Sequence, residues 1–495
     1  MTDEPQDSGG GSDDESAAGA PHAQAAQIAQ APPDASSGAS IAASSGASSS
    51  ASSGGSPAGS PSASPSASIA AIEQLIAAGD EPAAFAQLRV GLGWPASRAI
   101  DAAALPRWLG AVAELAHRRG AGELAQLAQD AVRDPDNPDR LYELGYALID
   151  AGAPDLAAAV LWRCLAVAGD SEDVVCELSA ALESTLAYAD AFAMLDARPA
   201  LRAESFLCRY LHAFNAAMAG RLDATRAALP LLAPDTEEAA AMVATIAAVV
   251  ERADRVAGAC PLDARDLRGW HYVLNGSLLA HQSPYGFDEP MHGRYAWLAD
   301  SLPRVAAGLE RLAALVRGLE LPCVYAPPGR GHEILARAAA AKLGLPLALW
   351  PAVGVPAPGL VVMYDLAELA PADIERLAPR RPDQVVFAHA SPWTHDSPIA
   401  PDLTTLLYQS LVPPWGESTL IDPETREVRR TAADERSAED VAAELVASEG
   451  LDAAELAADE PARWEALVAR AWPPPAGGRR PRLRAGGPVS SSRFA

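Results

Sequence analysis

Apolar residues recur at helical spacing from about Ile69 onward. Ile72, Leu75 and Ile76 lie three or four positions apart, and the same period predicts helices over residues 106–118 and 122–132. The stretch 134–138, Asp-Pro-Asp-Asn-Pro, then interrupts the pattern, with Asn at a suitable N-cap position and Pro at a suitable first helical position. The first half of the folded chain is therefore expected to consist of short helices joined by tight turns.

These helical segments return with a period of about 34 residues. Leu144 and Leu178 are 34 positions apart, and Ala157 and Ala191 are also 34 apart. The glycine between the two helices of a repeat, Gly152, returns two periods later at Gly220. The pattern resembles the tetratricopeptide repeat family over about residues 105–250. That resemblance implies stacked helical hairpins that bind a protein or peptide partner. A generic array of helical hairpins is the alternative, because positions 179, 186 and 225 depart from the family pattern.

Beyond about residue 256 the apolar pattern changes to short strands that alternate with helices, which is typical of an α/β domain. Strands are expected at 322–326, 346–350, 360–364 and 384–388, and helices at 302–319, 332–343 and 371–377. Alternating strands and helices indicate at least some parallel pairing in the sheet. Asn275-Gly276 lies between two apolar runs and predicts a type I′ β-hairpin.

Changes in composition divide the chain into five parts. Residues 1–68 are rich in Ser, Ala, Gly and Pro and contain neither Lys nor Arg, which predicts disorder. Residues 69–255 form the helical array, 256–430 the α/β domain and 431–472 an acidic helical segment. Residues 473–495 are rich in Pro, Gly and Arg and are expected to form a disordered tail.

Charge and cysteine usage limit the possible functions. A formal net charge of −26 argues against nucleic-acid binding. No apolar run is long enough to suggest a membrane span, and the polar N-terminus does not look like a secretory signal, so a cytoplasmic protein is expected. The five cysteines are scattered without a CxxC pair and are expected to be reduced thiols, with no metal site and no cofactor.

Candidate chemistry is concentrated on the α/β domain. Gly329-Arg330-Gly331-His332 precedes an expected helix and suits an anion, Asp365 follows a strand, and His389 ends another. Six of the nine histidines lie between positions 270 and 396. Arg330, His332, Asp365 and His389 are therefore the candidate ligand-binding residues, although no histidine spacing fixes two metal ligands on one face.

Tyr325-Ala-Pro-Pro-Gly-Arg-Gly-His, followed by Leu-Gly-Leu-Pro346, resembles type I phosphoribosyltransferases over about residues 320–370. The resemblance implies a strand, a loop and a helix that lead into a further strand. In that family a later strand ends in paired acids and a Thr/Gly-rich loop. Here residues 361–368 contain one acid at the strand end and no such loop, so a degenerate relative is implied.

Two functions follow from these observations. The periodic helices predict an adaptor that holds a protein or peptide partner. The alternative is a ligand-binding or enzymatic α/β domain controlled by the helical repeats. A folded pocket that brings His332, Asp365 and His389 together would favour the alternative.

Overall fold

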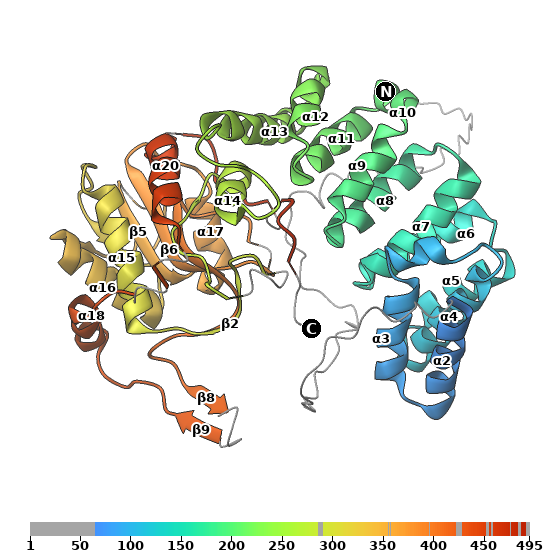
Figure 1. Cartoon of the computed structure of the whole chain (residues 1–495), viewed down its shortest axis with the longest axis horizontal. Coiled ribbons are helices and arrows are strands. Elements are labelled where there is room, and N and C mark those ends of the chain that lie inside the picture. The colour runs from blue at the N-terminus through green and yellow to red at the C-terminus, as the bar shows by residue number, and fades with distance from the viewer. Residues whose placement is uncertain are drawn as a thin grey trace, which may run out of the picture.

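The computed structural model describes residues 65–285, 291–354, 356, 358–395, 397–421, 428–451, 455–456, 459–475, 477–483 and 487–491. Residues 1–64 of the segment that we expect to be disordered (1–68) lie outside the described residues. The first described helix begins at Pro65. Figure 1 shows a curved array of helices on one side and a sheet covered by helices on the other. The expected order, helices first and an α/β domain second, is confirmed.

The array is a series of paired helices. Its members are α2 (Pro65–Ala78), α3 (Glu81–Leu92), α4 (Leu105–Arg118), α5 (Gly122–Arg133), α6 (Pro138–Asp150), α7 (Pro154–Ala168), α8 (Glu172–Ser184), α9 (Tyr188–Asp196), α10 (Pro199–Glu204), α11 (Phe206–Met218), α12 (Leu222–Ala228) and α13 (Glu237–Arg255). Helices α6, α8 and α11 begin at 138, 172 and 206, and their partners α7, α9 and α12 begin at 154, 188 and 222. Both series advance by 34 residues, the spacing expected from the sequence.

Small residues allow the paired helices to approach each other. A Cβ atom added to Gly145 of α6 would lie 2.5 Å from Cγ of Leu161 on α7, so this pair needs glycine. In the turn between α8 and α9, Leu186 has φ 62°, the left-handed conformation that Gly152 and Gly220 adopt in the neighbouring turns. The departures from the repeat pattern are therefore accommodated locally: Ser179 at the position of Gly145 is fully buried, and its hydroxyl donates to the Val175 carbonyl.

The second part is built on one parallel sheet. Its strands are β1 (Leu278–Leu279), β2 (Tyr295–Ala299), β3 (Val324–Tyr325), β4 (Leu347–Ala348), β5 (Gly359–Asp365), β6 (Gln384–Pro392) and β7 (Leu403–Val412). The strand order is β1-β7-β6-β5-β3-β4, and β2 also pairs with β7. The chain reverses its direction across the sheet between β3 and β5, so this is the point where ligands bind in many α/β proteins. A separate antiparallel hairpin joins β8 (Ser418–Ile421) and β9 (Val428–Thr431).

Helices cover both faces of this sheet (Figure 1). Residues of α15 (Leu302–Val316), α16 (Arg330–Leu343) and α18 (Ala438–Ala447) share one core with alternate residues of β5 and β6. The 3₁₀ turn Leu366–Glu368 and α17 (Pro371–Leu377) pack on the other face. The C-terminal helix α20 (Pro461–Ala471) and α14 (Leu267–Asn275) complete the domain. None of the helices in the described part of the chain is long and apolar enough to cross a membrane.

The prediction of a β-hairpin at Asn275-Gly276 is wrong. Asn275 is the last residue of helix α14, and Gly276 caps that helix with φ 64° while its N–H donates to the Tyr272 carbonyl. Glycine favours the left-handed conformation both in a type I′ turn and after a helix C-terminus, so the dipeptide alone does not separate the two structures.

The expectation of a disordered C-terminal tail is also wrong for its described residues. Arg480 is 1% exposed, and its NH2 group lies 3.1 Å from Oδ2 of the buried Asp402. Val489 is buried in the same core as Trp270, and the nearby Gly487 lies close to Met218 of the array helix α11. Burial in the α/β core and a paired charge therefore hold this segment in place.

Candidate functional site

Three of the four predicted site residues lie near the carboxyl edge of the sheet. His332 lies in the first turn of α16, Asp365 is the last residue of β5, and His389 lies in the neighbouring strand β6. Side chains alternate between the faces of a strand, so Asp365 points away from the face that carries Tyr364. The structure therefore places His332 and His389 on one face and Asp365 on the other.

A buried carboxylate, Asp300, connects the residues of the first face. Its Oδ2 accepts hydrogen bonds from Nε2 of His389 and from the hydroxyl of Tyr364, both at 2.9 Å. Its Oδ1 accepts from the backbone N–H of Ser301 at 2.8 Å and from Arg304 at 3.2 Å. Burial opposes ionisation, but His389 and Arg304 outweigh it and lower the pKa of Asp300.

His332 is held as a neutral imidazole. Its Nδ1 accepts a hydrogen bond of 3.1 Å from the backbone N–H of Tyr364, so Nε2 carries the proton. Burial lowers the pKa of this fully enclosed ring to about 4. Within the described part of the chain, Nε2 has no hydrogen-bond partner, and the nearest acid is Glu368 at 3.9 Å.

The other two predicted residues belong to different environments. Asp365 accepts a hydrogen bond of 2.5 Å from the Tyr408 hydroxyl and another from the Ala367 N–H, while burial raises its pKa. Arg330 is exposed and donates to the backbone carbonyls of Asp434 and Arg436. The four predicted residues therefore have separate hydrogen-bond partners, although the charge of His389 acts to lower the pKa of Asp365, and their role in ligand binding stays a prediction.

Aromatic side chains pack beside the first turn of α16, where a Cβ atom added to Gly331 would lie 3.4 Å from Tyr364 and 3.5 Å from Trp415. Trp415 packs edge-on against Tyr364 with ring centroids 4.7 Å apart, and Tyr364 stacks on His389 at 5.4 Å. Sequence reasoning missed Asp300, the residue that joins this network. The available signal was an acid directly after a strand and before Ser301, which caps α15.

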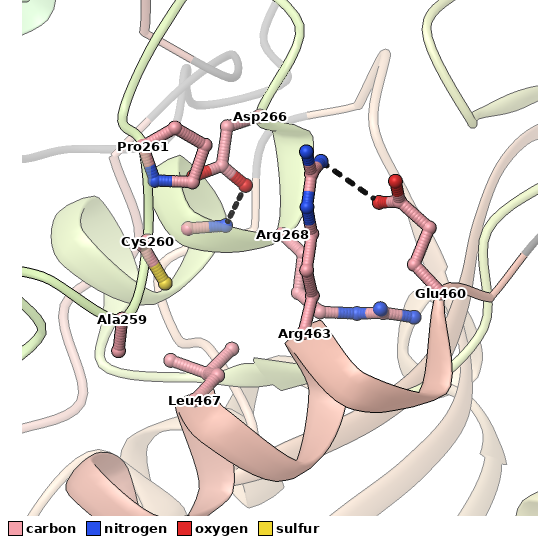
Figure 2. A pocket seen from close by; sticks show the side chains of 9 residues that line it. Ala259, Cys260, Pro261, Asp266, Arg268, Glu460, Arg463 and Leu467 are labelled. Atoms are coloured by element: carbon pink, nitrogen blue, oxygen red, sulfur yellow. Dashed lines mark hydrogen bonds and ion pairs between the residues drawn. The ribbon is translucent and has the colours of Figure 1, made fainter.

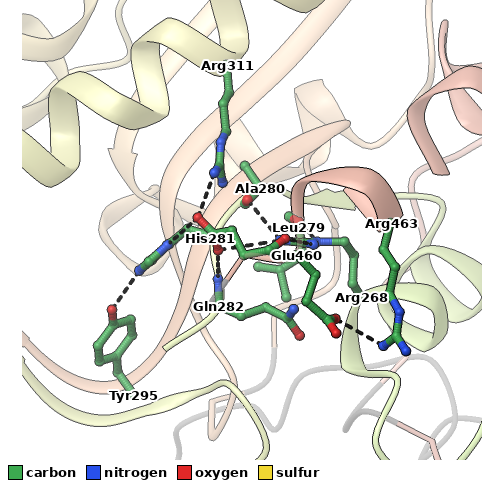
Figure 3. Close-up of polar contacts among 10 residues, drawn as sticks. Arg268, Leu279, Ala280, His281, Gln282, Tyr295, Arg311, Glu460 and Arg463 are labelled. Carbon is green, nitrogen blue, oxygen red and sulfur yellow. Dashed lines mark hydrogen bonds and ion pairs between the residues drawn. The ribbon is translucent and has the colours of Figure 1, made fainter. Parts of the chain in front are cut away.

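The remaining histidines of the predicted cluster do not converge on this network. Nδ1 of His281 donates a hydrogen bond to the Asp459 carboxylate at 2.9 Å, and Nε2 of His281 shares a hydrogen bond of 2.7 Å with the Tyr295 hydroxyl, as Figure 3 shows for the network around this ring. Asp459 is fully buried and also pairs with Arg311 at 2.6 Å. This network joins the segment before α20 to the edge of the sheet, and all of its ionised groups have partners, so we assign it a structural role.

A small pocket lies beside that network, between the segment before α14 and helix α20 (Figure 2). Its polar groups are also engaged: Asp266 accepts from the N–H of Gly269, and Arg463 pairs with Glu460 at 3.0 Å. The buried Arg268 donates to the Leu279 and Ala280 carbonyls behind the pocket. The pocket therefore marks where α20 docks.

A different polar cluster lies in the array, where sequence reasoning expected a binding surface without naming residues. The first helices of successive repeats, α6, α8 and α11, lie side by side. We call the side chains of Tyr142, Asp150, Asp173 and Glu177 on α6 and α8 the acidic face. In the described structure none of its three acids forms an ion pair with Arg or Lys. Other acids of the array do form ion pairs, for example Asp155 with Arg89 at 2.8 Å.

Burial and mutual repulsion dominate the electrostatics of the acidic face. Burial, with the nearby charges of Asp150 and Asp173, raises the pKa of Glu177. Elsewhere on α8, burial raises the pKa of Glu183 to about 7, although Asn215 donates a hydrogen bond to it at 2.7 Å. Burial and the charges of Glu177 and Asp173 raise the pKa of Tyr142 to about 12. This surface is therefore a concentration of negative charge that the chain does not neutralise.

Comparisons with known proteins add little to this geometry. No protein-family model matches the chain, and a search of curated proteins found no match. Among solved structures, a purine phosphoribosyltransferase from Pyrococcus horikoshii aligns with 15% identity and a TM-score of 0.20. The alignment covers 26% of this chain and 98% of that one. A likeness of this size carries no argument about fold or activity, so function has to be argued from the residues themselves.

Proposed function

We propose that the protein is an adaptor whose helical array, of the tetratricopeptide type, holds a basic segment of a partner protein on the acidic face. Support for the repeat type comes from the two series of helices that advance by 34 residues. Arrays of this kind expose an extended surface because each repeat packs only on its neighbours.

The observation that carries the proposal is the unmatched charge at Glu177. This side chain is 6% exposed, and its Oε2 has no hydrogen-bond partner among the described residues. A buried carboxylate oxygen without a hydrogen bond costs free energy, on the order of 1–3 kcal/mol. A guanidinium or ammonium group from a partner would offset that cost, because charge-assisted hydrogen bonds are strong when they are shielded from water.

The neighbouring groups suit the same kind of partner. Asp150 and Asp173 supply further negative charge within interaction range of Glu177. Tyr142 offers an aromatic ring beside these carboxylates, and a cation over an aromatic face is attracted by about 0.5–1 kcal/mol at exposed sites. We therefore propose a segment with several Arg or Lys residues as the ligand.

The proposal is tested by fluorescence anisotropy with the full chain and a labelled peptide of alternating Arg and Ala. Saturable binding that weakens as salt is raised is the expected result, because the contacts are largely electrostatic. A peptide of equal length with Gln in place of Arg is the control and should not bind. Equal binding of both peptides, or binding of neither, would contradict the proposal.

A second candidate function follows from His332. Its Nε2–H is buried without a partner at the start of α16, near the reversal point between β3 and β5. We propose as the alternative that a small molecule accepts a hydrogen bond from this group once Trp415 moves aside. Thermal-shift measurements with nucleotides and phosphosugars test this. A stabilisation that His332→Asn abolishes would favour the alternative, and no response to any compound would leave the α/β domain as a scaffold.

A further inference from the structure

Two cysteines and a glutamate meet between the first helices of adjacent repeats. Glu172 and Cys176 lie one turn apart on α8, and Cys208 lies in the first turn of α11. One ligand atom from each residue falls within 4.8 Å of the others. Among the described residues, this is the one group of three or more His, Cys, Asp or Glu side chains that meets such a distance.

We propose that Cys176, Cys208 and Glu172 bind a zinc ion. Two thiolates and one carboxylate are a ligand set that suits zinc, and soft sulfur donors select it against magnesium or calcium. Three protein ligands leave one tetrahedral position for water. Binding replaces the two thiol protons, which pass to solvent, with two zinc–sulfur bonds, and the Glu172 carboxylate adds a zinc–oxygen bond.

The repeat register explains why there is room for an ion here. Positions 142, 176 and 210 are equivalent in α6, α8 and α11, and the outer two are tyrosines. Cys176 therefore places a small thiol where each neighbouring repeat carries a large ring. The smaller side chain allows Cys208 and Glu172 to approach the same point.

The surroundings favour negative charge on these ligands. Glu172 and Cys208 both lie in the first turn of a helix, where the helix dipole stabilises anions.

A neighbouring hydroxyl orients the ligands. Ser205 donates to Oε1 of Glu172 at 2.6 Å and accepts from the backbone N–H of Cys208 at 3.1 Å. One residue thus fixes the carboxylate and the helix turn that carries the thiol, and it leaves the second carboxylate oxygen available. Groups that position ligands in this way typically change metal affinity by about 10- to 100-fold.

The test is zinc binding by the reduced full chain in competition with a chromophoric chelator, followed by cobalt substitution. We expect one equivalent of zinc and a thiolate-to-cobalt charge-transfer band. Cys176→Ser and Cys208→Ser should abolish both signals, and Ser205→Ala should weaken zinc binding by about 10- to 100-fold. Cys164→Ser is the matched control, because Cys164 is a buried thiol of the same array outside the cluster, and this variant should bind zinc normally.

Circular dichroism of each variant separates loss of zinc binding from loss of folding, and Glu172→Gln, which alters no thiol, provides a second probe that should weaken binding. No zinc uptake by the folded wild type would overturn the proposal. So would uptake that Cys176→Ser and Cys208→Ser leave unchanged. Mild oxidation could also lower the protein mass by two hydrogen atoms, which marks a disulfide bond. That result, without zinc uptake by the reduced protein, would identify a redox-active cysteine pair and overturn the zinc proposal.

Discussion

Neutralising Glu183 should stabilise the protein in a pH-dependent way. The pKa of this carboxyl rises from 4.5 to about 7 on folding, chiefly because burial disfavours its charged form. Each pKa unit corresponds to about 1.36 kcal/mol, so the full shift corresponds to about 3 kcal/mol. Part of the side chain still reaches solvent, and we therefore expect about 2 kcal/mol.

The sign follows from proton linkage. Below pH 4.5 the carboxyl is protonated in the folded and unfolded states and has no effect on the difference between them. As pH rises from 4.5 to 7, the unfolded chain ionises first, so the wild type loses stability. Glu183→Gln lacks this loss, and its amide oxygen can still accept the hydrogen bond from Asn215.

Urea unfolding followed by circular dichroism at pH 5, 6.5 and 8 measures the effect. The free energy of unfolding of Glu183→Gln should exceed that of the wild type by about 2 kcal/mol at pH 8 and converge with it toward pH 5. Glu143→Gln, an exposed change on α6, should stay within about 0.5 kcal/mol at every pH. A variant that is no more stable than wild type at pH 8, or a difference that does not depend on pH, would refute the reasoning.

Three further predictions address the packing of the array and the α/β domain. Gly145→Ala should lower the free energy of unfolding by about 1–3 kcal/mol, because its Cβ would overlap Leu161. Gly110→Ala, in open space within α4, should instead raise it by about 0.5–1 kcal/mol, and equal effects in urea unfolding would contradict the packing argument. Arg480→Ala should cost about 3 kcal/mol by leaving Asp402 with one guanidinium fewer. Arg479→Ala, at an exposed neighbour, should change stability by less than about 0.5 kcal/mol; similar thermal shifts for the two variants would show that the segment is not docked. Because the pKa of His332 falls to about 4 on folding, the wild type should lose about 3 kcal/mol between pH 6.5 and 4 through this ring. His332→Asn should not show that part of the loss, and parallel stability–pH curves would disprove the assignment of a neutral imidazole.

The sequence predicted those parts of the fold that depend on local spacing. The 34-residue period located the helices because each hairpin repeats the same length, and Leu186 was recognised as a turn position from its register alone. The strands β3 to β6 were recognised as apolar runs between turn signals. Strand β7, which pairs with three neighbours, was missed, although residues 403–412 are mostly apolar and include the β-branched Thr404, Thr405 and Val412.

The site was less predictable because its partners are distant in the chain. Asp300 contacts His389 from 89 positions away, and Arg480 reaches Asp402 across 78. No local pattern specifies such pairs, so His332 and His389 were grouped with Asp365, which lies on the opposite face of the sheet. The acidic face was missed for a related reason: Glu177 matters because it lacks a base, and a missing partner becomes visible only in three dimensions.

The central claim is that the acidic face binds a basic segment, and isothermal titration of one triple variant tests it most directly. Asp150→Asn, Asp173→Asn and Glu177→Gln together remove three charges. Burial raises the pKa values of Asp150 and Glu177, so amides at these two positions should not destabilise the fold. The matched control removes three exposed acids of the array elsewhere: Asp235→Asn, Glu237→Gln and Glu238→Gln. We predict that the first variant loses at least about tenfold in affinity for the Arg-rich peptide, at about 0.5 kcal/mol or more for each charge, while the control binds like wild type. Equal losses of affinity in the two variants would show that only the net charge of the protein matters, and they would contradict binding at the acidic face.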